Sequence, residues 1–268
     1  MILEPVRRLV YWSAFAINIQ ANRADACCLA NWSSVLQQVR MNAVENFLRI
    51  LRFDQPERVI SRIPVQVIRY NGNMHEAYDG SGGDSSPVGT IWTDIWGTTW
   101  SKIQDEVMGM PVGCPLQAIH ALKPFKWPDP NDERICTKIY KMAQEFPGGD
   151  LLLGGSHRDT LWEKAYMLGG MEAMMINFLT EPEFVREVLH HIMDFQLGIA
   201  AHYLKLGVKV AFLGDDLGSQ IGPLLSPRLM RQYLLPEYQR LCSLYKDNGV
   251  LIRFHSCGHV EAALDLFL

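Results

Sequence analysis

VKVAFLGDD, residues 208–216, is a short apolar run that ends in a glycine and two aspartates. An apolar run bounded by turn-forming residues predicts a buried β-strand over 208–214. Before it, apolar residues at helical spacing predict helices over 159–206. After it, Ser226-Pro227 predicts a helix start, and this helix should reach about Asp247 with a kink at Pro236. The strand therefore lies between helices, as in an α/β fold.

The same alternation of strands and helices extends in both directions along the chain. Further strands are predicted over 63–68, 150–154 and 250–254, and further helices over 132–146 and from His259 onward. Because strands alternate with helices, we expect the four strands to lie parallel and adjacent in one sheet, with helices outside it.

Two segments stand apart from this alternation. Residues 1–40 lack a clear period and are interpreted as an atypical N-terminal extension, whereas residues 41–268 form the organised domain. Within that domain, residues 71–130 are rich in Gly, Ser, Pro and Trp. They predict an insertion or lid with two short strands, near Trp92 and Trp100.

Composition excludes several functional classes. A formal net charge of -4 and a pI of about 6.1 argue against a nucleic-acid partner. The six cysteines lack the spacing of a disulfide framework, which favours reduced thiols in a cytoplasmic protein. The run 9–19 loosely imitates a signal peptide, but Ser13 and Asn18 interrupt it, and it is too short to span a membrane.

His255 and Cys257 follow the predicted strand 250–254 and lie two residues apart, so their side chains should point the same way. Imidazole and thiolate both suit Zn²⁺, and a catalytic zinc takes about three protein ligands plus an open position. A third ligand is missing from this pair. His259 is a candidate, although Gly258 should turn the chain between them. The alternative is that both residues serve packing.

Polar residues also follow two other predicted strands. Asp215, Asp216 and Gln220 come after 208–214, where they could orient a substrate or a metal-bound thiol, although one aspartate could instead accept hydrogen bonds from backbone donors. His157 and Arg158 come after 150–154 and are candidate substrate contacts.

Trp96 is a third candidate substrate contact, because it lies between Trp92 and Trp100 in the insertion. These tryptophans could cover a flat cofactor, or they could form the small core that holds the insertion against the rest of the fold.

Three sequence segments together resemble the uroporphyrinogen decarboxylase superfamily, in its methyltransferase-like branch. They are GDDLGSQ (214–220), GPLLSP (222–227) and HSCG (255–258), with Pro236 between the last two. Weaker similarity extends over nearly everything after Met41. The resemblance implies a (β/α)₈ barrel of the TIM type, with zinc bound by His255, Cys257 and a later cysteine.

The resemblance also bears on the length of the chain. Such a barrel takes about 250 residues, and only four strands are convincing here. We therefore expect an incomplete barrel that lacks C-terminal βα units, with the later cysteine beyond Leu268.

The activity that the resemblance implies is methyl transfer between a corrinoid and a thiol or small methylated compound, with zinc as cofactor. Asp216 and Gln220 would position the acceptor, and the insertion would face the corrinoid or its carrier protein. One alternative is the decarboxylase activity itself, although the usual arginine-rich run is replaced here by Ile68-Arg69-Tyr70-Asn71. Another alternative is an inactive fragment or binding module.

Overall fold

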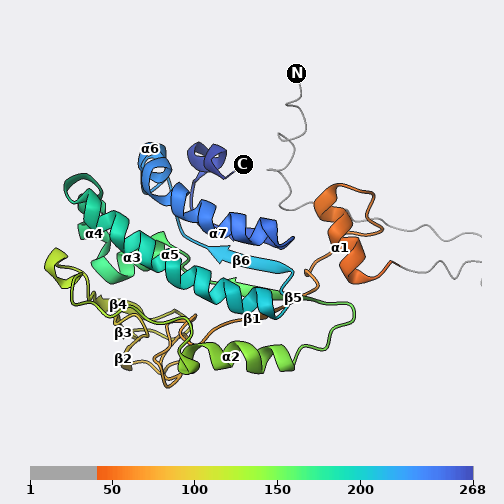
Figure 1. Cartoon of the computed structure of the whole chain (residues 1–268), viewed down its shortest axis with the longest axis horizontal. Helices are drawn as coiled ribbons and strands as arrows, with labels where there is room; N and C mark the ends of the chain where they lie inside the picture. The colour runs from red at the N-terminus through yellow and green to blue at the C-terminus, as the bar shows by residue number, and fades with distance from the viewer. Residues whose placement is uncertain (1–40, 268) are drawn as a thin grey trace, which may run out of the picture. The chain divides into compact units, whose positions relative to one another are not determined.

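A computed structural model of the protein describes residues 41–267, which contain a four-stranded parallel sheet with helices packed against it (Figure 1). The sheet order is β1 (Val65–Ile68), β5 (Leu152–His157), β6 (Val210–Gly214) and β7 (Leu251–His255). All three strand pairs are parallel, so the predicted adjacency of the four strands is confirmed. The extension 1–40 and its signal-like run lie outside the described residues.

The two faces of the sheet differ in what covers them. On one face, Ile68 and Ala211 are fully buried, and a Cβ added to Gly155 would lie 2.5 Å from the Tyr203 ring of a covering helix. On the other face, Ser156, Phe212 and Arg253 form one row, because they are paired in register across β5, β6 and β7. This second face carries polar side chains, among them Ser156 and Arg253.

Residues 41–267 contain seven α-helices: α1 (Ala43–Arg52), α2 (Glu133–Gln144), α3 (Trp162–Gly169), α4 (Met171–Thr180), α5 (Pro182–Lys205), α6 (Pro227–Leu229) and α7 (Leu235–Asp247). The predicted helical region 159–206 is three helices, because Gly170 has a φ of 82° between α3 and α4, and Pro182 starts α5.

At the kink predicted near Pro236, the helix is interrupted by a π-helical turn. A short helix α6 (Pro227–Leu229) leads into the π-helix η3 (Met230–Leu234) and then into α7. Proline has no N–H to donate to the preceding turn, so the regular α-helical ladder cannot pass through this position.

The predicted helix from His259 is wrong in its start and type, because the structure has a 3₁₀ helix, η4 (Glu261–Leu266). His259 instead forms a β-bridge with Ser219, which keeps the chain non-helical at that point.

The insertion forms its own small antiparallel sheet, in the order β2 (Ile91–Thr93), β3 (Thr99–Ser101) and β4 (Met110–Gly113), followed by a 3₁₀ turn, η2 (Ile119–Ala121). The two predicted strands are present, and β4 was not predicted. Trp92 and Trp100 are buried and pack with Met167 of α3, so the tryptophans hold the insertion against the helices.

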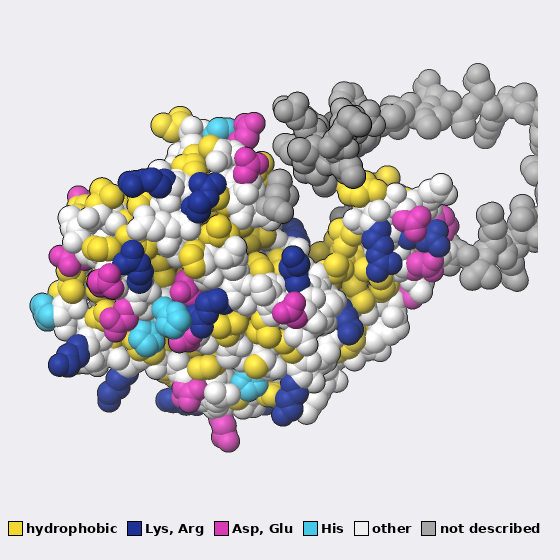
Figure 2. Space-filling model, turned by 45° about the horizontal axis from the view of Figure 1, so that its top comes forward, with side chains coloured by type: hydrophobic (Ala, Val, Ile, Leu, Met, Phe, Trp, Pro, Cys, Tyr) yellow, Lys and Arg dark blue, Asp and Glu magenta, His cyan; other side chains and the backbone are white. Residues whose placement is uncertain are grey.

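Charges of both signs are mixed on the surface of the described residues. On the described part of the face shown in Figure 2, acidic, basic and histidine side chains are interspersed, and no large area carries one sign of charge. Among residues 41–267, no helix combines the length and the apolar character that crossing a bilayer requires.

Candidate metal centre

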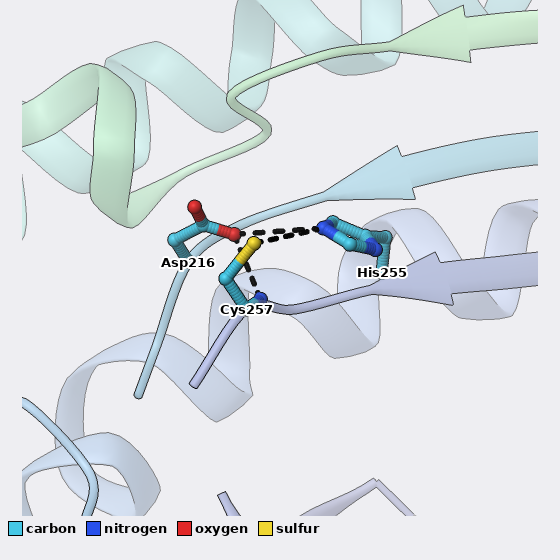
Figure 3. A group of neighbouring side chains, drawn as sticks. All are labelled: Asp216, His255 and Cys257. Atoms are coloured by element: carbon cyan, nitrogen blue, oxygen red, sulfur yellow. Dashed lines mark hydrogen bonds and ion pairs between the residues drawn. The ribbon is translucent and has the colours of Figure 1, made fainter. Parts of the chain in front are cut away.

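Asp216, His255 and Cys257 converge where β6 and β7 end (Figure 3). His255 is the last residue of β7, Cys257 follows two residues later, and Asp216 lies two residues beyond β6. The His255 Nε2 atom is 3.3 Å from Cys257 Sγ and 3.7 Å from Asp216 Oδ1. The three potential ligand atoms all lie within 4.8 Å of one another.

Backbone contacts fix the two loops that carry these side chains. The Cys257 N–H donates to Asp216 Oδ1 at 2.8 Å, and the Gly218 N–H donates to the Cys257 carbonyl at 3.2 Å. Gly258 has a φ of 80°, and a Cβ there would lie 2.3 Å from the Gly218 carbonyl carbon. Only glycine permits this approach, so the loops after β6 and β7 are held together by their main chains.

The electrostatic surroundings keep the thiol protonated in the absence of a cation. The Asp216 carboxylate accepts a hydrogen bond from the Cys257 thiol and raises its pKa, and partial desolvation acts in the same direction. A divalent cation bound between these groups would reverse that effect, because it favours the thiolate.

Glu163 supports the site from the first turn of α3. Its Oε2 atom accepts a hydrogen bond from the Asp216 N–H at 3.0 Å. Burial raises the pKa of Glu163 to about 8, with the charges of Asp159, Asp215 and Asp216 adding to the shift. Sequence reasoning missed this residue, although an acidic side chain in a first helical turn close to a predicted strand end was visible.

Asp215, predicted as catalytic, has a structural role instead. Its carboxylate is fully buried and accepts hydrogen bonds from the N–H groups of Leu161, Trp162 and Glu163, and from the Tyr238 hydroxyl. Burial raises its pKa to about 7. Asp215 thus accepts hydrogen bonds from the backbone donors at the start of α3 that have no partner within the helix, which is the alternative that the sequence left open for one of the two aspartates.

His157, predicted as a substrate contact, lies on the helix-covered face. It is the last residue of β5 and fully buried, with hydrogen bonds to Gln196 at 2.8 Å and to the Tyr245 hydroxyl at 2.5 Å. Burial lowers its pKa to about 4. The strand was predicted to end at residue 154, and its three extra residues place His157 among packing groups.

The other predicted residues lie outside the group formed by Asp216, His255 and Cys257. Gln220 is exposed in the loop after β6, and no hydrogen bond within residues 41–267 joins it to the three converging residues. Trp96 is buried against Phe195, with ring centroids 4.6 Å apart. His259 lies outside the group and pairs with Glu261 at 3.5 Å. Of the secondary candidates, Arg158 alone lines a cavity together with His255.

Fold and site together define an α/β protein with an open parallel sheet and a His–Cys–Asp group at the carboxyl ends of two neighbouring strands. The family model described as uroporphyrinogen decarboxylase (URO-D) matches residues 116–268. The chain therefore belongs to the uroporphyrinogen decarboxylase family, which confirms the superfamily that its motifs indicated.

Comparison with solved structures shows the same fold elsewhere. A structure described as "methyltransferase from Methanosarcina mazei" is similar, with a TM-score of 0.53 and 14% sequence identity. The match covers 84% of this chain and 73% of that one. At this identity the likeness concerns the fold. No curated protein sequence matches the chain.

Proposed function

We propose that this chain is a zinc-dependent methyltransferase that moves a methyl group between a corrinoid and a thiol or small methylated compound. The observation that carries the proposal is the convergence of Asp216, His255 and Cys257 at the carboxyl ends of β6 and β7. The carboxyl ends of parallel strands are where barrel enzymes hold their reacting groups. We also propose that the four strands belong to a (β/α)₈ barrel, as the family and the fold likeness suggest.

The donor set and its spacing fit zinc. Nitrogen, sulfur and carboxylate oxygen are the atoms that bind Zn²⁺ in proteins, and three protein ligands leave one position for substrate. Zn–N and Zn–S bond lengths place neighbouring tetrahedral ligands roughly 3.4–3.6 Å apart. The 3.3 Å and 3.7 Å separations from His255 Nε2 lie close to this range. Asp216 would thus supply the third ligand that the sequence motif lacks.

Zinc bound here would lower the pKa of a coordinated thiol and supply a thiolate at neutral pH. The protein's own contribution is to fix the three side chains before substrate arrives. The Cys257 N–H orients the Asp216 carboxylate, and Glu163 holds the Asp216 main chain. With side chains of His255 61% and Asp216 40% exposed, the open side of the group is accessible to a small substrate.

A corrinoid, free or on a carrier protein, would approach from the side of the insertion. The indole rings of Trp92, Trp96 and Trp100 are buried, so they do not offer a stacking surface to a flat cofactor. The exposed face of the small sheet instead presents Ile91 and Val112, which suits contact with a protein. The proposed reaction is cytoplasmic and involves neither nucleic acid nor membrane.

One observation favours the decarboxylase alternative. Arg69 directly follows β1, and its Nε atom is buried without a hydrogen-bond partner among the described residues. An arginine near the first strand is what a substrate bearing several carboxylates would require. This second candidate needs no metal, so zinc content separates the two.

The test combines metal content with activity. We expect the purified protein to bind one zinc per chain and to transfer a methyl group from methylcobalamin to a thiol. His255→Ala and Cys257→Ala should remove both properties, whereas His259→Ala, a neighbouring histidine outside the group, should change neither. Zinc is measured by inductively coupled plasma mass spectrometry, and methyl transfer by the absorbance change of the corrinoid.

Other outcomes would reject the proposal. Zinc content that survives both substitutions would show that these residues are not the ligands. Decarboxylation of a porphyrinogen by metal-free protein would favour the decarboxylase alternative. Stoichiometric zinc without methyl transfer or decarboxylation would favour a binding module.

A further inference from the structure

Three consecutive residues at the start of the insertion contact the end of β5 and the loop that follows it. The three side-chain contacts are Asn73 with Ser156 at 3.2 Å, Met74 with Arg158 at 2.9 Å, and His75 with Asp159 at 2.5 Å. They run in the same order along both segments, so the turn 72–76 lies alongside the loop between β5 and α3. The partners are 83 or 84 positions apart in the chain, so the contacts join two distant segments at one end of the sheet.

The contact between His75 and Asp159 is the most buried of the three, since their side chains are only 1% and 4% exposed. Burial alone would raise the pKa of Asp159, but the hydrogen bond from His75 and the nearby cations Lys164 and Arg158 lower it on balance. Asp159 is therefore ionised and can only accept, so the Nε2–H of His75 donates the hydrogen bond. A charged acceptor this deeply buried makes a strong contact, because water does not compete for it.

Both partners have an uncommon backbone conformation. His75 has a φ of 65° and Asp159 a φ of 50°, in the left-handed region that residues other than glycine seldom adopt. Such a conformation persists where surrounding contacts hold it. For His75 these are the Trp100 ring, stacked with centroids 4.1 Å apart, and Trp92 Nε1, which donates to the His75 carbonyl at 2.7 Å. For Asp159, Lys164 Nζ lies 3.8 Å from the carboxylate, so the pair is fixed from the small sheet and from α3.

The residues that precede this pair face the candidate metal centre. Met74 and Arg158 line a cavity of about 350 Å³ that a side chain of the metal centre also lines. Arg158 also pairs with Asp84 of the insertion at 3.0 Å, so this part of the cavity wall depends on how the insertion is placed. Because Met74 is followed directly by His75, and Arg158 by Asp159, a shift of the buried pair would move the wall.

We propose that His75 and Asp159 are positioning residues of the candidate site. Their contact fixes the turn 72–76 against the loop after β5. It thereby holds Met74 and Arg158 in the cavity wall, so that a substrate beside the metal centre meets a fixed surface. The effect of the pair on local order does not depend on the reaction, whereas its effect on substrate affinity rests on the proposed function. The pair makes no hydrogen bond to the three side chains of the metal centre among residues 41–267, so zinc binding should not require it.

The first measurement is hydrogen–deuterium exchange of the whole chain, read by mass spectrometry. His75→Asn tolerates the left-handed backbone, but its shorter side chain does not reach Asp159. We expect the amides of 72–76 and 158–160 to exchange roughly 10- to 100-fold faster in this variant, because a buried hydrogen bond to a charged group is lost. Adding Asp159→Asn should have little further effect, since both substitutions act on one contact. The amides of β6 should keep their protection.

The second measurement separates positioning from general stability. With methylcobalamin as donor and 2-mercaptoethanol as acceptor, His75→Asn should raise the KM for the thiol roughly tenfold and leave kcat within about twofold. His75→Gln, whose amide nitrogen takes the place of Nε2, should recover most of this loss. Zinc content should stay unchanged in both variants. His190→Asn is the control, because it alters an exposed histidine that lies 3.7 Å from Asp194, and it should change neither exchange nor KM.

The outcomes divide as follows between the two proposals. Unchanged exchange of 72–76 in His75→Asn would overturn the positioning role, and so would a loss of protection spread over β5, β6 and β7, which would indicate a role in overall stability. Faster local exchange with an unchanged KM in an active protein would overturn the link to the substrate. If the unaltered protein shows neither zinc binding nor methyl transfer while the local exchange effect is present, the pair fixes the cavity wall and the methyltransferase proposal fails.

Discussion

Asp215 and Asp216 are adjacent in sequence, yet substitution of each should affect a different property. Asp215→Ala removes a fully buried acceptor for three backbone N–H groups and for the Tyr238 hydroxyl. Each buried donor left without a partner costs about 1–3 kcal/mol, and water entering the vacated space recovers part of that. We expect a loss of about 3–5 kcal/mol in the free energy of unfolding. Asp215→Asn retains an acceptor oxygen and should lose less.

Asp216→Ala should leave stability nearly unchanged and should instead affect zinc binding. The Asp216 side chain is 40% exposed, and it accepts one backbone hydrogen bond in the loop. Its removal should change the free energy of unfolding of the metal-free protein by less than about 1 kcal/mol. The same substitution should abolish stoichiometric zinc binding, because two ligands remain.

The assay is urea unfolding of metal-free protein, followed by far-ultraviolet circular dichroism, together with zinc analysis of each variant. Wild-type stability in Asp215→Ala would refute the role of Asp215 at the start of α3. A greater stability loss in Asp216→Ala than in Asp215→Ala would refute the division between a structural and a ligand aspartate.

Two further predictions concern burial and the joined loops. Burial lowers the pKa of His157 from 6.5 to about 4, so the folded protein disfavours the protonated imidazole. The stability that this neutral imidazole contributes is therefore present above about pH 6.5 and is lost as the pH falls towards 4. Across that window the unaltered protein should lose about 3 kcal/mol more than His157→Gln in urea unfolding, and parallel pH profiles would contradict this. Gly258→Ala should destabilise the protein by about 1–3 kcal/mol and weaken zinc binding, because its Cβ would collide with Gly218. Gly222→Ala, where a Cβ meets no atom within 4 Å, is the control, and equal thermal stability of the two variants would reject the argument.

The sequence predicted the sheet well because each strand is a short apolar run bounded by turn-forming residues. The order and parallel direction of β1, β5, β6 and β7 followed from the alternation with helices. The ends of the strands were harder to predict, because Gly154 and Gly155 within β5 are residues that typically end a strand. In the structure they permit close contact with Phe212 and Tyr203, and β5 continues to His157.

The site was predictable in outline but not residue by residue. His255 and Cys257 were expected to share a direction, and they lie 3.3 Å apart. The sequence could not show which of Asp215 and Asp216 faces the metal centre, because adjacent residues at a strand end point to opposite sides. That choice depends on where the first turn of α3 is packed.

The main-chain contact between Gly218 and Gly258 has a consequence for the evolution and redesign of the centre. Two segments about forty positions apart are held together at Gly218 and Gly258 by backbone atoms, so this contact does not depend on which side chains occupy positions 216, 255 and 257, although the Asp216 carboxylate adds one hydrogen bond between the loops. Those three side chains can therefore be substituted while the main chain of the two loops keeps nearly the same position. Replacing Cys257 by aspartate should shift preference from zinc towards harder cations, whereas a larger residue at 218 should disrupt every version of the centre.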